Sequence, residues 1–203
     1  KMLNDRRLRV AAVAFRTRRG YAAFEDLDRR VTATKAAMEL ASQLGAPLVL
    51  NSIGPVPPDD DAVGRQLLRD VLDDLGRYGN HVGATLAAET GNESGSQLAR
   101  VLAELPDQYL AVDFNPGRLM AGGHSPMDAV AALGRWIGYV EATDARRKEL
   151  VALGRGDVDL PALLAALDEH GYRGCFALGS VDGRDPKREL ADAISQMRSL
   201  TAS

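Results

Sequence analysis

Acidic and amide side chains stand at the ends of short apolar runs in this sequence. The third, fourth and fifth runs end in such residues: Glu89, then Asp113 with Asn115, then Glu141 with Asp144. Carboxylates act as general bases in proton transfer, and oxygen ligands of this kind bind hard divalent cations. If the runs are strands of one parallel sheet, these groups share one rim. Several carboxylates on one rim repel each other, so they require a counter-cation or raised pKa values.

The apolar runs alternate with longer segments of helical period, which is typical of βα units around a parallel sheet. Ser125, Asp159 and Asp185 are placed to begin the last three helices, and Gly45 to end the first. The predicted strands are 8–15, 48–51, 84–89, 110–114, 137–142 and 175–178, and the predicted helices are 25–44, 63–75, 98–105, 126–135, 159–170 and 185–197. We therefore expect six strands, each followed by a helix, in one α/β domain spanning 1–203.

Such an array closes either as a doubly wound sheet or as a (β/α) TIM-type barrel, and both carry their sites after the carboxyl ends of the strands. A dinucleotide-binding sheet needs a glycine-rich turn after its first strand. Here that strand runs into Arg16, Thr17, Arg18 and Arg19 before Gly20. The missing turn and the polar rim favour the barrel.

The arginines after the first strand are the candidate substrate-binding cations. Arg16, Arg18 and Arg19 follow the end of that strand, and guanidinium groups bind phosphate or carboxylate bidentately. We assign substrate binding to Arg18 and Arg19, and also to Asp144 at the fifth strand. The alternatives are a solvated basic turn for the arginines and a structural loop cap for Asp144.

Composition excludes several classes of protein. The 203 residues are 45% hydrophobic, and a net charge of −3 provides no positive field for a nucleic acid. The single Cys175 cannot form an internal disulfide, and no apolar run approaches the roughly 18 residues of a membrane span. We therefore expect a cytoplasmic protein that binds neither nucleic acid nor membrane, with a homo-oligomer as a possible state.

Several segments together resemble the sugar phosphate isomerase/epimerase family, the xylose isomerase-like TIM barrels. They include Leu-Gly-Ala-Pro-Leu-Val-Leu at 44–50, Leu-Ala-Ala-Glu-Thr at 86–90, Asp-Phe-Asn-Pro-Gly-Arg-Leu at 113–119 and Tyr-Val-Glu-Ala-Thr-Asp-Ala at 139–145. The family barrel has eight strands, and the best match places 8–15 on the third. The resemblance thus implies that six of the eight βα units are present and that the two amino-terminal units are absent.

The resemblance also implies a divalent metal site and its ligands. Family enzymes hold the metal with Glu, Asp, His and Glu after four successive strands, and the two Glu residues move the substrate proton. Glu89 matches the first ligand and is the candidate catalytic residue. Asn115, with Asp113 as a substitute, falls at the second position, Glu141 at the third and Gly179 at the fourth. Such an oxygen set suits Mg²⁺ or Mn²⁺ better than Zn²⁺, and the loss of ligands makes a metal-free protein an equal alternative.

These departures leave the activity open. The resemblance implies a protein that acts on or binds a sugar, sugar phosphate or polyol, with weak or lost isomerase or epimerase catalysis because Gly179 supplies no acid or base. A non-catalytic carbohydrate-binding or scaffold protein is the alternative. An endonuclease IV-like DNA repair enzyme uses the same barrel, but it needs several histidine ligands and a basic groove, and this chain has three histidines and an acidic pI near 5.7.

Overall fold

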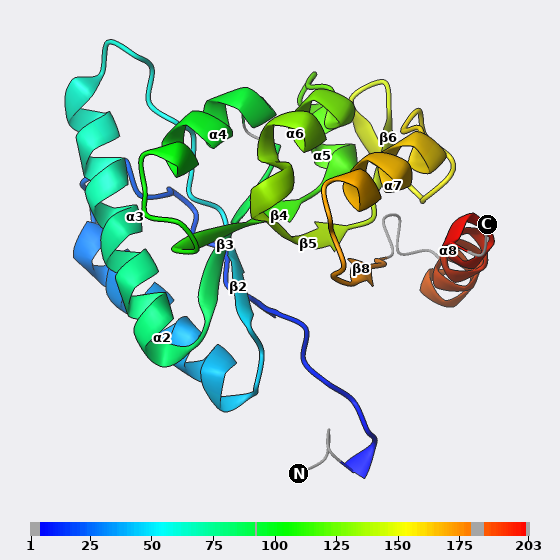
Figure 1. Ribbon diagram of the computed structural model, residues 1–203, viewed down its shortest axis with the longest axis horizontal. Coiled ribbons are helices and arrows are strands. Elements are labelled where there is room, and N and C mark those ends of the chain that lie inside the picture. Colours follow the sequence, from blue (N-terminus) through cyan, green and yellow to red (C-terminus); the bar gives the residue numbers. More distant parts are fainter. Residues whose placement is uncertain (1–4, 92, 180–184, 202–203) are drawn as a thin grey trace. The chain divides into compact units, whose positions relative to one another are not determined.

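The computed structural model describes residues 5–91, 93–179 and 185–201. Six strands form one sheet in the order β1-β2-β3-β4-β5-β8 (Figure 1). They are β1 (Val13–Ala14), β2 (Leu48–Asn51), β3 (Thr85–Glu89), β4 (Leu110–Phe114), β5 (Ile137–Glu141) and β8 (Phe176–Ala177). All six predicted strands are present. The first is much shorter than the predicted 8–15 because its partner β2 has only four residues, of which Val49 and Leu50 pair with Val13 and Ala14.

The helices follow the strands as the alternation predicted. They are α2 (Leu27–Gln43), α3 (Ala62–Val82), α4 (Gly95–Ala103), α5 (Pro116–Ala121), α6 (Pro126–Leu133), the 3₁₀ turn η1 (Gly134–Trp136), α7 (Leu160–Glu169) and α8 (Pro186–Thr201). The predicted caps are confirmed: Ser125 accepts a hydrogen bond from the Asp128 amide, and Asp159 accepts one from the Ala162 amide. Gly45 ends α2 with φ of +70°, a conformation open to glycine at little cost.

Two features were not predicted. Helix α5 begins at Pro116, where Asn115 acts as its N-cap. Strands β6 (Asp144–Arg146) and β7 (Glu149–Val151) form an antiparallel hairpin in the connection after β5.

The chain divides into two compact units. The first comprises Lys1–Glu89 with Arg100–Val112, and the second comprises Thr90–Ala99 with Asp113–Ser203. In the first unit, β2 pairs in parallel with both β1 and β3. Helices α2 and α3 pack side by side against these strands (Figure 1). The core between them contains Met38, Val49, Leu72, Leu75 and Leu86, each fully buried.

In the second unit, β5 pairs in parallel with β8, and Glu141 lies opposite Ala177 in this register. Aliphatic side chains from α5, α6 and α7 supply the core of this unit. They include Leu119, Val130, Leu133, Leu163 and Leu167, which are all buried.

A buried polar cluster ties the connection after β1 to α2 in the first unit. The Tyr21 hydroxyl lies 2.7 Å from the Thr34 hydroxyl, which itself donates to the Arg30 carbonyl. Burial raises the pKa of Tyr21 to about 12. The phenol therefore stays neutral and anchors this connection to α2.

Removing this hydroxyl tests the anchor. We expect Tyr21→Phe to lower the free energy of unfolding by about 1 kcal/mol, because the buried Thr34 hydroxyl loses a partner. Urea unfolding measures the change. The matched control is Tyr109→Phe, since the Tyr109 hydroxyl has no hydrogen-bond partner among the described residues, and this change should stay within about 0.5 kcal/mol. Equal losses in the two variants would contradict the role of the anchor.

Candidate functional site

The polar side chains singled out in the sequence stand at strand ends. Glu89 and Glu141 are the last residues of β3 and β5, Asp113 lies within β4, and Asn115 directly follows β4. Glu89, Asp113 and Asn115 are all at least nine-tenths buried. Glu89 belongs to the first unit and the other three to the second.

In the first unit, the Glu89 carboxylate forms an ion pair with Arg16. The Arg16 Nε donates a hydrogen bond to Oε1 of Glu89. The Glu89 side chain is 5% exposed and the Arg16 side chain 44% exposed. The negative charge of a nearly buried carboxylate is thus balanced by a guanidinium that is partly exposed to solvent.

The strand register explains why these two side chains meet. Leu50 of β2 pairs with Ala14 on one side and with Ala87 on the other, so these three side chains share one face of the sheet. Arg16 and Glu89 each lie two residues beyond such a partner. Both therefore project from that same face.

The segment after Arg16 is fastened to the connection after β2. The Thr17 hydroxyl donates to the Asn51 side-chain oxygen at 3.1 Å and to the Ser52 carbonyl at 2.9 Å. Further on, Gly20 and Gly54 approach so closely that a Cβ on Gly20 would lie 2.3 Å from the Gly54 Cα. These contacts hold the backbone that carries Arg16.

The other predicted arginines have different surroundings. Arg19 forms an ion pair with Glu25, and both side chains are more than half exposed. Arg18 is exposed as well. Their assignment to substrate binding stays a prediction, whereas the pairing of Arg16 with Glu89 was not predicted.

In the second unit, Asn115 and Glu141 are joined by a hydrogen bond. Asn115 Nδ2 donates to Oε2 of Glu141 at 2.6 Å. The Asn115 side-chain oxygen accepts from the Arg118 amide at 2.8 Å and from the Thr143 hydroxyl at 2.5 Å. Both ends of the Asn115 amide are therefore engaged, one on Glu141 and the other on α5 and Thr143.

Asp113 on β4 and Tyr139 on β5 are two further polar residues of the second unit. Asp113 is fully buried, and the Thr90 amide donates to its backbone carbonyl at 3.0 Å. Burial, together with the charges of Cys175, Asp113 and Glu141, raises the pKa of Tyr139. Tyr139 is thus a neutral phenol on the same strand as Glu141. Tyr139 was not predicted as a site residue, although it alternates with Glu141 along β5.

Asp144 organises the connection after β5. Its fully buried carboxylate accepts from four backbone amides, those of Ala145 and Val158 on Oδ1 and those of Gly154 and Gly156 on Oδ2, at 2.8 to 3.0 Å. These bonds hold the segment after the β6–β7 hairpin against the start of β6. These contacts match the alternative prediction, in which Asp144 is a structural loop cap. Contact of Asp144 with a substrate stays a prediction.

Glu93 is a buried carboxyl group that sequence reasoning missed. Its side chain is 6% exposed, and neither carboxyl oxygen has a hydrogen-bond partner among the described residues. Burial raises the pKa of Glu93 to about 7. No pattern in the polar loop that contains it distinguishes it from an exposed glutamate.

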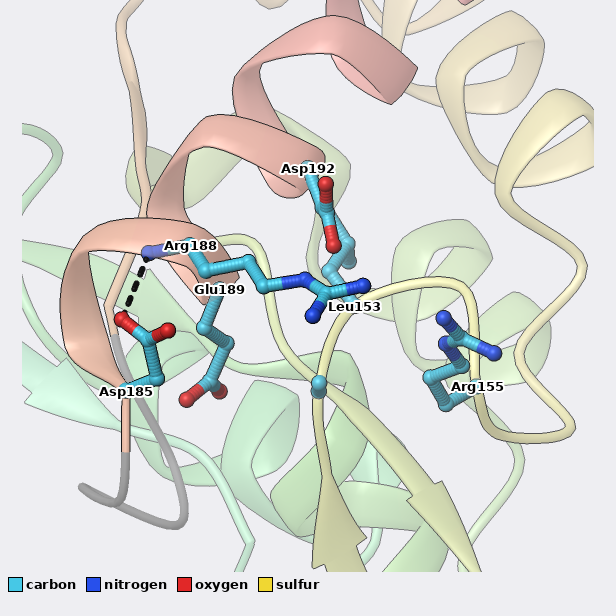
Figure 2. Close-up of a pocket in the computed structure, with 7 residues that line it drawn as sticks. Leu153, Arg155, Asp185, Arg188, Glu189 and Asp192 are labelled. Atoms are coloured by element: carbon cyan, nitrogen blue, oxygen red, sulfur yellow. Dashed lines mark hydrogen bonds between the residues drawn. The ribbon is translucent and has the colours of Figure 1, made fainter.

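A separate cavity of about 200 Å³ lies in the second unit, between the segment after β7 and the start of α8. Figure 2 shows Arg188 extending from α8 toward Arg155, while Asp185 accepts a hydrogen bond from the Arg188 amide at 3.2 Å. None of the residues that the sequence analysis assigned to a site lines this cavity. The strand-end chemistry therefore does not take place in it.

A family model described as a xylose isomerase-like TIM barrel matches residues 1–200. The chain belongs to this family. The predicted family and barrel type are therefore confirmed. Comparison with curated proteins finds no match.

Several solved structures share this fold. A xylose isomerase domain protein from Planctomyces limnophilus is 26% identical, with a TM-score of 0.88 over 98% of this chain and 80% of that one. A xylose isomerase-like TIM barrel protein from Mycobacterium smegmatis in complex with magnesium is 16% identical, with a TM-score of 0.78 over 98% and 74%. D-allulose 3-epimerase from Methylomonas sp. in complex with D-allulose is 19% identical, with a TM-score of 0.75 over 96% and 71%.

Two of the residues at the family's metal-ligand positions, Glu89 and Glu141, are engaged by other groups of the chain. Glu89 is engaged by a cationic guanidinium, and Glu141 accepts a hydrogen bond from the amide that replaces an aspartate. At the fourth position, Gly179 has no side chain, and a Cβ added to it would meet nothing within 4 Å. Over 5–91, 93–179 and 185–201, no three His, Cys, Asp or Glu side chains are grouped to hold a metal.

In the described ranges, no helix is both long enough and apolar enough to cross a bilayer. The histidine ligands that an endonuclease IV-like enzyme needs are not gathered there in a metal-binding group either.

The role of Asp144 leads to a prediction about stability. We expect Asp144→Asn to lower the free energy of unfolding by about 3 kcal/mol, because the amide nitrogen cannot accept the backbone hydrogen bonds that Oδ2 accepts. Chemical denaturation measures the loss. The control is Asp157→Asn in the same connection, where an exposed ion pair to Arg146 at 3.4 Å is worth less than about 1 kcal/mol. A loss no greater than that of the control would refute the structural role of Asp144.

The burial of Glu93 predicts how stability depends on pH. Between its ordinary pKa of 4.5 and its folded value of about 7, the unfolded chain releases the proton while the folded chain keeps it. The stability contribution of Glu93 is therefore fully present below pH 4.5 and is lost as the pH rises through 7. Relative to Glu93→Gln, the wild-type free energy of unfolding should fall by up to about 3 kcal/mol across this window. Urea titrations at stepped pH values measure the difference, and parallel curves for the two proteins would show the assignment to be wrong.

Proposed function

We propose that this protein binds a sugar, sugar phosphate or polyol and catalyses metal-dependent isomerisation or epimerisation only weakly or not at all. Membership of the xylose isomerase-like family supports the ligand class. The structure of a D-allulose 3-epimerase in complex with D-allulose supports it further, since that protein shares the fold.

One observation carries the proposal of weak catalysis. The groups at the second and third ligand positions are bonded to each other, with Asn115 donating to Glu141 at 2.6 Å. Asn115 carries no negative charge to attract a cation, and its hydrogen bond occupies an oxygen of the carboxylate that would replace a histidine. Gly179 removes the fourth ligand altogether. Asn115 and Glu141 therefore form a hydrogen-bonded structural pair in place of two metal ligands.

The remaining side chains limit the proton chemistry. Epimerisation takes a proton from one face of a carbon and returns it to the other, which needs a second group opposite the first. Glu89 can act as one base, but Gly179 provides no partner. Each positioned acid or base contributes typically about 10²- to 10⁴-fold to such a step. A single base can still remove a proton and return it on the same side.

A non-catalytic carbohydrate-binding role is the second candidate, and the same side chains favour it. Asn115, Thr143 and Glu141 form a connected set of donors and acceptors at a strand end. Glu141 and Thr143 are only partly buried, and carboxylate and hydroxyl oxygens hydrogen-bond well to sugar hydroxyls. Such a protein would bind ketoses or polyols with no turnover.

The proposed function predicts a combination of binding and slow turnover. The purified protein is assayed with Mg²⁺, Mn²⁺ and Zn²⁺ against a panel of ketoses, sugar phosphates and polyols, and binding of the same compounds is measured by calorimetry. We expect at least one compound to bind, with turnover far below the typical enzyme range of about 1 to 10³ per second. Turnover within that range would contradict the loss of catalysis, and binding of none of the compounds would contradict the ligand class.

A further inference from the structure

The cavity between the segment after β7 and the start of α8 contains none of the strand-end residues discussed above. Its volume is about 200 Å³, and it lies entirely within the second unit. Its lining is mostly ionisable and consists of Ala152, Leu153, Arg155, Asp185, Arg188, Glu189 and Asp192. A cavity with this lining suits a charged or polar ligand.

Two arginines reach this cavity from different elements. Arg155 stands in the segment after β7, Arg188 stands near the start of α8, and Figure 2 shows the Arg188 side chain extending toward Arg155. Within residues 5–91, 93–179 and 185–201, neither guanidinium has a hydrogen-bond or ion-pair partner. Two positive charges directed into one space repel each other, and an anion between them turns this repulsion into attraction.

The carboxylates around the cavity leave both guanidinium groups open to a ligand. The Asp185 carboxylate caps α8, since it accepts a hydrogen bond from the Arg188 amide at 3.2 Å. Asp192 lies one helical turn after Arg188, so the two side chains stand on the same side of α8. In the described part of the chain they form no ion pair with each other. Each guanidinium therefore keeps five N–H donors for a ligand.

A phosphate group matches the two arginines. The planar fork of a guanidinium donates two parallel hydrogen bonds to a phosphate, and two arginines from different elements can contact different oxygens of the same group. An ionised carboxylate such as Asp192 only accepts hydrogen bonds. The part of the ligand beside Asp192 must therefore carry donors, and hydroxyl groups supply them.

We propose that this cavity binds a phosphate monoester of a polyhydroxylated small molecule. Arg155 and Arg188 hold the phosphate group, and Asp192 accepts a hydrogen bond from a hydroxyl group of the same molecule. The inference goes beyond the proposed function, because it concerns a second site and does not require a sugar to bind at the strand ends.

The experiment measures binding of three probes to the purified protein by calorimetry at neutral pH and low ionic strength. D-glucose 6-phosphate carries both the phosphate and the hydroxyl groups, methyl phosphate carries the phosphate alone, and D-glucose carries the hydroxyl groups alone. We expect D-glucose 6-phosphate to bind more tightly than methyl phosphate. Added salt should weaken both, because it screens the charges.

Variants of the two arginines test the phosphate contacts. Arg155→Met and Arg188→Met should each weaken binding of both phosphate monoesters by about 10-fold or more, because each change removes charge-assisted hydrogen bonds. The matched control is Arg29→Met on α2. Arg29 is also exposed and also has no side-chain partner in the described ranges, but it belongs to the first unit, so binding should not change.

A variant of Asp192 tests the hydroxyl contact. Asp192→Ala should weaken binding of D-glucose 6-phosphate, which loses an acceptor. The same change should tighten binding of methyl phosphate, because a negative charge near the phosphate is removed. Shifts in the same direction for the two monoesters would overturn the assignment of a polyhydroxylated ligand.

Three results would overturn the site itself. They are no binding of either monoester, unchanged binding in folded Arg155→Met and Arg188→Met, and an equal loss in Arg29→Met. Circular dichroism establishes that each variant is folded. If D-glucose 6-phosphate binds equally well to the wild type and to both cavity variants, the ligand class of the proposed function is supported while this inference fails.

Discussion

The chemistry at the end of β3 depends on how the charge of Glu89 is compensated. Glu89 is 5% exposed, and the Arg16 guanidinium is its cationic partner. A divalent ion would need this carboxylate as a ligand, but the guanidinium already donates to it. Two contacts hold the segment that carries this cation. Thr17 is hydrogen-bonded to the end of β2, and Gly20 closely approaches Gly54.

The second unit shows the corresponding change on β4 and β5. Asn115 has no charge to contribute to a metal site, and its amide instead joins Glu141, Thr143 and the start of α5. Asp144, further along the same connection, holds four backbone amides. Polar residues that stand in the family's motifs thus stabilise local structure here. A barrel can keep its strand-end architecture while the side chains at those ends change function.

Sequence reasoning succeeded where the information is local. The alternation of apolar runs predicted all six strands, and Ser125 and Asp159 marked their helix starts because a cap acts within one turn. The hairpin after β5 was missed because Asp144 stabilises it through residues up to 14 positions away. The Arg16–Glu89 pair joins residues 73 positions apart, and only the register of β1, β2 and β3 brings them to one face. Burial of Glu93 likewise depends on tertiary packing that no neighbouring residue signals.

The central claim is that a guanidinium stands in the place of a metal ion at Glu89. The most direct test is anomalous diffraction at the manganese edge from crystals of the purified protein grown with millimolar Mn²⁺. The account predicts density for the Arg16 guanidinium against the Glu89 carboxylate, with no anomalous peak at that carboxylate. A manganese peak within coordination distance of Glu89, with Arg16 displaced, would contradict it.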